Sequence, residues 1–283
     1  MRIRRLVSHG TLLLVIILAL VGWSNAAAYS AIIVYGDSFS DNGNLYRLLG
    51  IPQPPYWNGR YSNGPVAAED LATTFGVTLL DEAWGGATTG IGNVTDGGTT
   101  GSLGYDQLPG MTTSLNATKH SFPPVLVHNS LFVVWGGIND FATNGLTLLT
   151  ADQAVSDMVA IVAALQAIGA KHILVPGIPD LGSTPLYRLQ SKAGWANYIS
   201  EYYNQHLRSA LPSGVVYYDT ATLYRKITAN PAQYGLSNVT DACYINGTVC
   251  GQPYLYLYWD ALHPTAHMHQ IIAGEFALAV SGK

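Results

Sequence analysis

The sequence predicts an α/β protein, a three-layer α/β/α sandwich around a parallel sheet, on two observations. Short apolar runs without polar alternation end at Gly, Pro or Asp, as expected of strands that are buried on both faces. These runs cover residues 31–35, 132–135, 173–175 and 215–218. Between and after them, apolar residues recur at helical spacing over 151–169, 191–211 and 265–276. In such a sandwich, functional groups lie on the loops that follow the carboxyl ends of the strands.

Length and composition favour one folded domain. The chain has 283 residues, of which 48% are hydrophobic and 11% charged, so it can bury a full core and is not disordered. Lys and Arg together number 13 against 17 acidic residues, with no basic run outside the N-terminus, which argues against a nucleic-acid partner. We find no internal repeat or linker and expect one catalytic domain over residues 29–283. Its least regular stretch, 88–127, is expected to form a functional rim loop or a mobile flap.

The first 28 residues have the three-part pattern of a secretory signal peptide. Three arginines stand near the start, an apolar run covers 11–21, and Ala26, Ala27 and Ala28 close the segment. The alternative is a membrane anchor, but the uninterrupted run is shorter than the roughly 20 residues that cross a bilayer. We therefore expect a secreted, extracellular protein without stable membrane anchoring.

Sequons and cysteines agree with export. Asn-X-Thr triplets predict N-glycosylation at Asn93, Asn116, Asn238 and Asn246. Cys243 and Cys250 are the only cysteines, and in an oxidising compartment they can pair across a short loop. Two buried thiols or a redox couple are the alternatives, and secretion favours the disulfide.

A candidate nucleophile stands where the first predicted strand ends. The strand leads directly into the segment Gly36-Asp37-Ser38-Phe39-Ser40. A serine at a strand-to-helix turn has an exposed hydroxyl and an amide near a helix N-terminus, where negative charge is favoured. Taken alone, the segment more commonly indicates helix capping by Ser38, Ser40 or Asp41.

A second segment near the C-terminus changes this balance. Asp260-Ala261-Leu262-His263 places a carboxylate three residues before an imidazole. Histidine is the usual general base for a serine, and a carboxylate fixes its tautomer and orients its ring. Because loops converge at one edge of an α/β sandwich, Ser38, Asp260 and His263 become a candidate triad.

Two further segments offer donors for an oxyanion. Ala83-Trp84-Gly85-Gly86 supplies glycine amides on a tight loop, and Gly137-Ile138-Asn139-Asp140 supplies a side-chain amide after a strand. Each segment alone is typical of an ordinary turn. The signature Gly-X-Ser-X-Gly is missing, since position 40 is serine, which favours a flavodoxin-like sandwich over the α/β-hydrolase fold.

In this order, the four segments resemble the four blocks of the GDSL, or SGNH, hydrolase superfamily. The resemblance covers about residues 31–280 and implies a flavodoxin-like parallel sheet of the SGNH-hydrolase type. It implies Ser38 as nucleophile, His263 as base and Asp260 as the residue that orients it. It also implies the Ser38 amide, the Gly85 amide and the Asn139 side chain as the oxyanion hole, with Gly86 as the alternative glycine.

The segments 56–65 and 259–265 resemble a secreted fungal branch that includes carbohydrate acetyl esterases. The resemblance implies a GDSL-type serine esterase that removes acetyl groups from plant-wall oligosaccharides. The alternatives are a lipase or lysophospholipase and, in another class, a catalytically silent secreted sugar-binding protein. We expect no cofactor and no metal, a small-molecule or oligosaccharide ester as partner, and a monomer.

Overall fold

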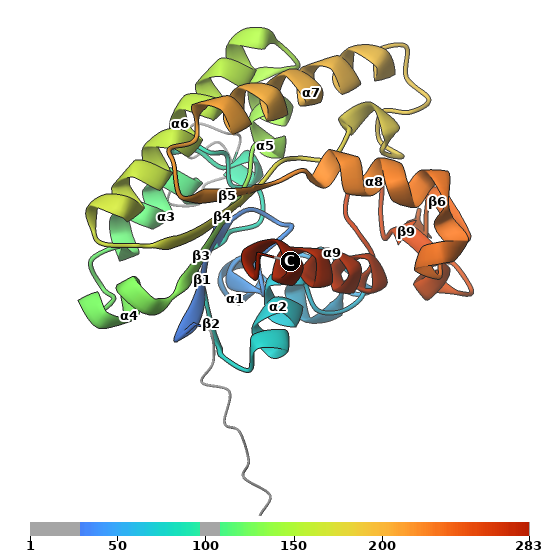
Figure 1. The fold of residues 1–283 in the computed structure, drawn as a ribbon. Coiled ribbons are helices and arrows are strands. Elements are labelled where there is room, and N and C mark those ends of the chain that lie inside the picture. The colour runs from blue at the N-terminus through green and yellow to red at the C-terminus, as the bar shows by residue number, and fades with distance from the viewer. Residues whose placement is uncertain (1–28, 97–107, 283) are drawn as a thin grey trace, which may run out of the picture.

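The computed structural model describes residues 29–96 and 108–282, and the predicted signal peptide lies outside them. A five-stranded sheet forms the centre of this part of the chain (Figure 1), with its strands in the order β2-β1-β3-β4-β5. All four strand pairs are parallel, and Ile33 of β1 lies opposite Leu80 of β2 and Phe132 of β3. The strands are β1 Ala31–Gly36, β2 Thr78–Asp81, β3 Leu131–Trp135, β4 His172–Pro176 and β5 Val215–Tyr218. This order is that of flavodoxin-like sheets, so the predicted fold class is confirmed.

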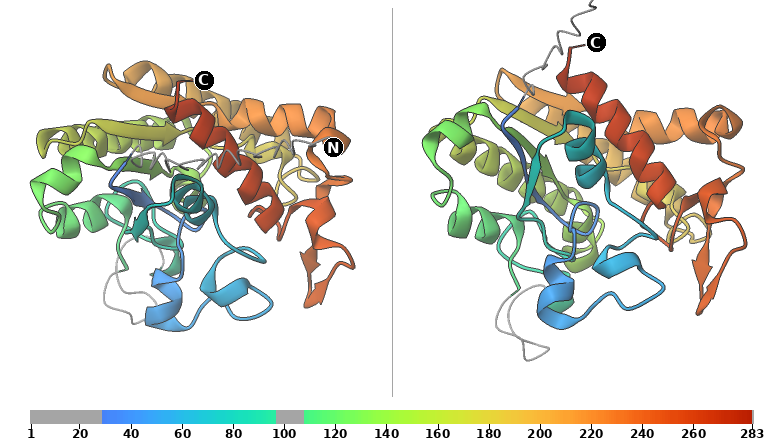
Figure 2. Two further views of the ribbon diagram at one scale, coloured as in Figure 1. Left: turned by 60° about the horizontal axis from the view of Figure 1, so that its bottom comes forward. Right: turned by 90° about the horizontal axis from the view of Figure 1, so that it is seen from below.

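Helices cover both faces of the sheet. On one face, α6 packs against α7 and contacts α3 and α5, and on the other face α2 packs against α9 (Figures 1 and 2). The helices on the first face are α3 Met111–Thr118, α5 Ile138–Asn144, α6 Leu148–Ala167 and α7 Ala193–Ala210. Those on the second face are α2 Ala67–Phe75 and α9 Ala266–Val280. The remaining helices are α1 Asn44–Leu49, α4 Pro124–Asn129 and α8 Thr220–Ala229.

The predicted strands and long helices agree with this arrangement. Every residue of β1 and β3 is buried, as the unbroken apolar runs predict for central parallel strands. Among the described helices, α6 is long and apolar enough to cross a membrane, but its buried face packs into the core. Its first turn is capped by Thr147, whose side chain accepts a hydrogen bond from the Thr150 amide at 3.1 Å.

A smaller lobe follows α8 and carries the C-terminal motif. Strands β6 Asn238–Ala242 and β9 Tyr256–Tyr258 pair in parallel, and β7 Tyr244–Ile245 pairs with β8 Thr248–Val249 as a short hairpin. From β9 the chain turns through Asp260 and His263 into α9. Because α9 then lies across the sheet, this turn is brought beside the carboxyl end of β1.

The structure corrects the expectation for residues 88–127. Two helices, α3 and α4, form within this stretch, and Met111 and Leu115 of α3 are buried in the core. Helix α3 is short, rich in threonine and has little apolar periodicity, so no local pattern predicts a helix there. The part that the structure describes is therefore packed scaffold, and residues 97–107 lie outside the description.

Candidate active site

Ser38 lies on a tight turn directly after β1. The amides of Ser40 and Asp41 both donate to the Asp37 carbonyl at 2.9 Å, which closes a single helical turn. Within the described residues, the Ser38 amide donates no hydrogen bond and so remains free for a ligand. The sequence predicted a helix at this point, but α1 begins only at Asn44.

Glycine is required where this turn leaves the sheet. A Cβ atom on Gly36 would lie 2.8 Å from the carbonyl oxygen of Trp135, at the end of β3. That carbonyl belongs to backbone and cannot move aside, so a larger residue would push β1 and β3 apart. The glycine therefore lets both strands deliver their following loops to one place.

The predicted triad residues are brought together. Ser38 Oγ lies 2.8 Å from His263 Nε2, and His263 Nδ1 lies 2.8 Å from Asp260 Oδ2. The His263 and Asp260 side chains are 12% and 15% exposed. Because an ionised carboxylate only accepts hydrogen bonds, it fixes the proton on Nδ1 and leaves Nε2 free to accept the serine proton.

Asp260 is held as a carboxylate by several donors. Its Oδ1 accepts the backbone amides of Leu262 and His263 at 2.8 and 2.7 Å. Burial alone would raise its pKa, but the charge of the His263 ring and these hydrogen bonds outweigh it and lower the pKa to about 2. Asp260 is therefore ionised throughout the neutral range and keeps orienting the imidazole.

Two tyrosines complete the surroundings of the Asp260–His263 pair. Tyr56 donates its hydroxyl to Asp260 Oδ2 at 2.8 Å, and the Tyr61 ring lies 4.9 Å from the His263 ring. Burial, followed by the charge of Asp260 and this hydrogen bond, raises the pKa of Tyr56, so the phenol stays protonated. In the sequence, both tyrosines lie in the segment 56–65, which carries a family resemblance and predicts no contact with Asp260 or His263. Their contacts cross more than 200 positions, which no local pattern reveals.

Replacing Tyr56 with phenylalanine is expected to lower kcat/KM about tenfold. A hydrogen bond to a charged group contributes roughly 1.5–3 kcal/mol, and its loss leaves Asp260 a weaker partner for the imidazolium that forms during catalysis. Ester hydrolysis followed from pH 5 to 9 measures the effect. An unchanged kcat/KM and pH profile would show that the Tyr56 hydroxyl serves stability alone.

The structure moves the glycine donor of the oxyanion hole by one residue. The Gly85 amide donates to Asp41 Oδ2 at 2.7 Å and is not available to a ligand, so its predicted role is wrong in this geometry. The neighbouring Gly86 amide donates no hydrogen bond within the described part of the chain. Gly86 has φ 82°, a conformation that suits glycine. We therefore assign the free Gly86 amide in place of Gly85.

Asn139 is anchored beside this glycine loop. Its Nδ2 donates one hydrogen to the Ala87 carbonyl at 3.0 Å, which leaves the second hydrogen free for an oxyanion. The next residue, Asp140, accepts hydrogen bonds from the Thr89 amide and hydroxyl at 3.0 and 2.7 Å. These bonds connect the loop after β2 to the start of α5, so the candidate donors are preorganised.

A model of the family described as GDSL-like lipase/acylhydrolase matches residues 32–276. The chain belongs to this family. The matched range includes the Ser38 turn, the glycine loop, Asn139 and the Asp260–His263 pair, so its four blocks meet at the site just described.

Curated relatives of this GDSL-like chain come from bacteria and plants. A phosphatidylcholine-sterol acyltransferase of Aeromonas hydrophila is 34% identical, over 80% of this chain and 69% of that protein. A thermolabile hemolysin of Vibrio parahaemolyticus is 25% identical, over 89% of this chain and 65% of that protein. A GDSL esterase/lipase of Arabidopsis thaliana is 25% identical, over 89% of this chain and 88% of that protein.

Solved structures share the fold at low identity. A catalytic mutant of an acetylxylan esterase from Geobacillus stearothermophilus gives a TM-score of 0.50 at 13% identity, with 89% of this chain and 94% of that chain covered. A second mutant of an esterase from that organism, described as acting on acetyl-xylooligosaccharide, gives 0.50 at 14% identity, covering 90% and 96%. At this identity the likeness concerns the fold of the GDSL-like chain.

The predicted disulfide is present in this GDSL-like protein. Cys243 and Cys250 are bonded and close the β7–β8 hairpin. Tyr244 of the hairpin stacks on Trp259, with ring centroids 5.7 Å apart, and meets the edge of Tyr56. The hairpin therefore supports the aromatic residues behind Asp260.

One predicted glycosylation site has another role. Asn93 is fully buried, and its Nδ2 donates to the carbonyls of Gly85 and Pro109 at 3.0 and 3.2 Å. A glycan on Nδ2 would break this pair of bonds and has no space, so we withdraw Asn93 as an acceptor. Asn93 instead fixes the loop that carries Gly86. Asn116 and Asn246 are exposed and Asn238 is half-buried, and glycosylation at these three stays a prediction.

His269 of α9 is buried in its neutral form. Its Nδ1 accepts the Ala67 amide at 3.1 Å, and its Nε2 has no hydrogen-bond partner within the described residues. Burial, aided by the charge of His263, lowers the pKa of His269 to about 3. The folded protein therefore resists protonation at a residue that the unfolded chain protonates near pH 6.5.

When the pH is lowered from 7.5 to 4.5, the unsubstituted protein is expected to lose about 2–3 kcal/mol more unfolding free energy than the His269→Asn variant. Below pH 6.5 His269 binds a proton in the unfolded chain but not in the folded protein. The unfolding free energy of the unsubstituted protein therefore falls by about 1.4 kcal/mol for each pH unit below 6.5. Urea unfolding of both proteins at the two pH values measures the difference. The raised pKa values of buried Asp37 and Asp140 act in the opposite direction but are shared by both proteins. Parallel pH dependences would contradict the neutral buried histidine.

Proposed function

We propose that this protein is a serine esterase that hydrolyses carboxylic esters through an acyl-enzyme on Ser38. The observation that carries the proposal is the continuous hydrogen-bonded connection from the Ser38 hydroxyl through His263 to Asp260. Free donors from Ser38, Gly86 and Asn139 lie in the segments that follow β1, β2 and β3, with Asn139 in the first turn of α5. This is the combination of nucleophile, base and oxyanion donors that acyl transfer requires.

In the first step, His263 Nε2 takes the Ser38 proton while Ser38 Oγ bonds to the ester carbonyl carbon. The carbonyl oxygen becomes an oxyanion and accepts hydrogen bonds from the three donors. When the tetrahedral intermediate collapses, the bond to the alcohol oxygen breaks and His263 returns its proton to that oxygen. Water then repeats the sequence on the acyl-enzyme, releasing the acid and restoring Ser38.

We propose short acyl groups as substrates, in particular acetyl groups on plant-wall oligosaccharides. Aromatic rings gather beside the triad, with Tyr56 and Tyr61 in contact with Asp260 and His263 and an exposed Trp57 next to them. Such rings pack against the apolar faces of sugars.

A lipase or lysophospholipase is the second candidate. Large aliphatic side chains are exposed near the carboxyl end of the sheet, with Leu149 in the first turn of α6 78% exposed and Leu189 82% exposed. The Leu186 amide donates to the Ala261 carbonyl at 2.8 Å, which connects the Leu189 loop to the triad turn. The 34% identical relative, named a phosphatidylcholine-sterol acyltransferase, supports this candidate as well.

A chain-length profile separates the two. Purified protein is assayed with p-nitrophenyl esters from acetate to palmitate, and with acetylated xylo-oligosaccharides. We expect kcat/KM to be highest at acetate and the oligosaccharides to be deacetylated. A maximum at eight or more carbons, with no acetate released from the oligosaccharides, would favour the lipase.

We also propose that the protein is exported and acts outside the cell as a monomer without a stable membrane anchor. The disulfide supports export, because such bonds persist in oxidising compartments. A silent sugar-binding protein would retain the fold without turnover. It is the conclusion that remains if the purified protein hydrolyses none of the esters.

A further inference from the structure

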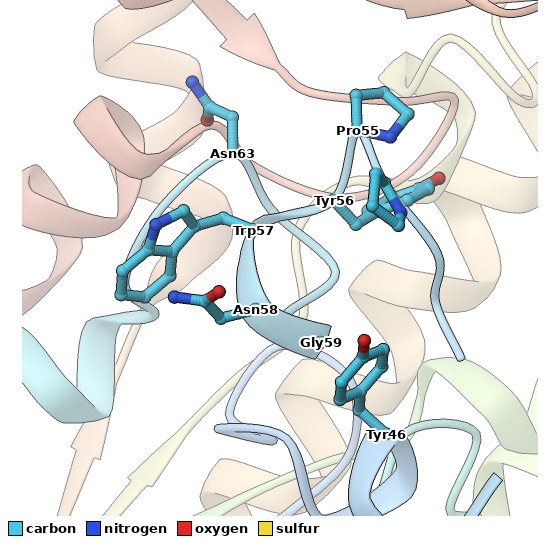
Figure 3. A pocket seen from close by; sticks show the side chains of 8 residues that line it. Tyr46, Pro55, Tyr56, Trp57, Asn58, Gly59 and Asn63 are labelled. Atoms are coloured by element: carbon cyan, nitrogen blue, oxygen red, sulfur yellow. The ribbon is translucent and has the colours of Figure 1, made fainter. Parts of the chain in front are cut away.

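A surface pocket lies one tyrosine side chain away from the triad. It has a volume of about 260 Å³ and is formed by the segment 54–59 with Tyr46 and Asn63. Figure 3 shows Trp57, Asn58 and Asn63 along one side, with Pro55 and Tyr56 across from them and Tyr46 near the foot. Tyr56 lines this pocket, and its hydroxyl donates a hydrogen bond to Asp260 of the triad, so this one side chain connects the pocket to the triad.

Three hydrogen bonds fix the pocket segment against the triad turn. Besides Tyr56, Ser62 donates its hydroxyl to the Pro264 carbonyl at 3.1 Å, and Asn63 Oδ1 accepts the Ala266 amide at 2.8 Å. These contacts lie on both sides of His263 along the chain. A molecule held in the pocket is therefore presented to the triad at a fixed distance.

The pocket exposes two aromatic rings that the core does not use. Trp57 is 39% and Tyr46 38% exposed. The Arg60 guanidinium lies 4.9 Å from the centre of the Trp57 ring and is itself hydrogen-bonded to both carboxylate oxygens of Glu69. The Trp57 ring is therefore held in place while part of it stays exposed to water. Such a ring can stack on a ligand and lose little conformational entropy on binding.

The polar groups of the pocket are neutral amides and hydroxyls. Asn63 uses its Oδ1 within the protein and keeps Nδ2 free, and the Asn58 side chain makes no hydrogen bond within the described part of the chain. Asn58 also has φ 47°, a conformation that is uncommon outside glycine and is frequent at ligand sites. Side-chain amides provide donors and acceptors together, which matches the hydroxyl groups of a sugar.

The lining disfavours other ligand classes. None of the side chains that line the pocket is charged, and the Arg60 guanidinium against Trp57 is already paired with Glu69, so an anion would find no free counter-charge. None is a long aliphatic chain, so an acyl chain would find rings and amides where it needs a continuous apolar wall. The volume lies just below the roughly 300–1,000 Å³ of pockets for drug-sized ligands, which suits one ring.

We infer that this pocket is a subsite for a neutral pyranose ring of the ester substrate, stacked on Trp57 and hydrogen-bonded by Asn58 and Asn63. The inference rests on the proposed esterase and specifies its substrate class as neutral oligosaccharide esters. The sugar in the pocket neighbours the one that carries the ester at Ser38. The subsite therefore contributes to the binding of oligosaccharides and leaves small artificial esters largely unaffected.

Kinetics of Trp57→Ala and Asn58→Gly test the subsite. Glycine accepts the backbone conformation of Asn58, so this variant removes the amide without strain and remains informative if Trp57→Ala fails to fold. For each variant, kcat/KM on acetylated xylo-oligosaccharides is expected to fall at least tenfold more than kcat/KM on p-nitrophenyl acetate, mainly through KM. The matched control is Trp195→Ala, a tryptophan on α7 that is also exposed, which should change neither value by more than twofold.

Direct binding uses the full chain with Ser38→Ala, titrated with xylotriose and, separately, with lysophosphatidylcholine below its micellar concentration. We expect saturable binding of xylotriose that Trp57→Ala weakens at least tenfold. Equal loss on both esters in kinetics, or binding of the lipid and not the sugar, would overturn the subsite while leaving the esterase intact. If the unsubstituted protein hydrolyses no ester, the proposed function itself fails, and xylotriose binding still reports on the pocket.

Discussion

Replacing Ser38 with alanine is expected to lower kcat for p-nitrophenyl acetate by about four to six orders of magnitude. The hydroxyl 2.8 Å from His263 Nε2 is the only nucleophile that the described geometry presents to that base. In a triad of this kind, removal of the serine alone costs nearly as much as removal of all three residues, because they act as one unit. The remaining turnover would come from the oxyanion donors acting on water.

The fold should survive this substitution. Within the described residues, Ser38 Oγ is hydrogen-bonded to His263 only. Alanine fits the same turn because the backbone hydrogen bonds of the turn run through Asp37, Ser40 and Asp41. Thermal unfolding within a few degrees of the unsubstituted protein is the control for the fold. Ser209→Ala, on the exposed face of α7, is the matched serine control and should keep full activity. More than about 1% activity in Ser38→Ala would remove Ser38 as nucleophile.

Replacing Asn139 with alanine is expected to lower kcat by about 10² to 10³ with little change in KM. The second hydrogen of its Nδ2 is free in the structure and meets a charge that exists only in the transition state, so its loss affects turnover more than substrate binding. Steady-state kinetics with p-nitrophenyl acetate gives kcat and KM separately for the variant and the unsubstituted enzyme.

The Asn139→Asp variant separates donation from structure. Aspartate keeps the size of the side chain but offers an anion where a donor is needed, so its kcat should fall at least as far as that of Asn139→Ala. If both variants stay within threefold of the unsubstituted enzyme, Asn139 only holds the Ala87 loop and the oxyanion hole is built differently.

Local patterns were sufficient to predict the scaffold and the triad. Apolar runs marked β1, β3 and β4 because both faces of a central parallel strand need apolar residues, and a similar run marked the half-buried edge strand β5. Asp260 and His263 could be paired because three positions separate them. Ser38 joined them through the rule that loops after parallel strands share one edge of the sheet. The edge strand β2 escaped detection, since its residues are only half-buried and end in an acidic pair.

Features that depend on distant contacts could not be predicted. The choice between Gly85 and Gly86 depends on Asp41, whose carboxylate accepts the Gly85 amide across 44 positions and so occupies that donor. The burial of Asn93 against Pro109 turns a sequon into a structural residue. The hydrogen bond from Tyr56 to Asp260 has no trace in the spacing of either residue.

Covalent labelling tests whether an imidazole activates the hydroxyl of Ser38. The protein is incubated with a p-nitrophenyl alkylphosphonate, digested and examined by mass spectrometry. A single adduct on the Ser38 peptide is predicted, with loss of one equivalent of p-nitrophenol, and labelling should slow at least a hundredfold in His263→Ala. An adduct on another residue, or equal labelling rates with and without His263, would mean that Ser38 is not a nucleophile activated by His263.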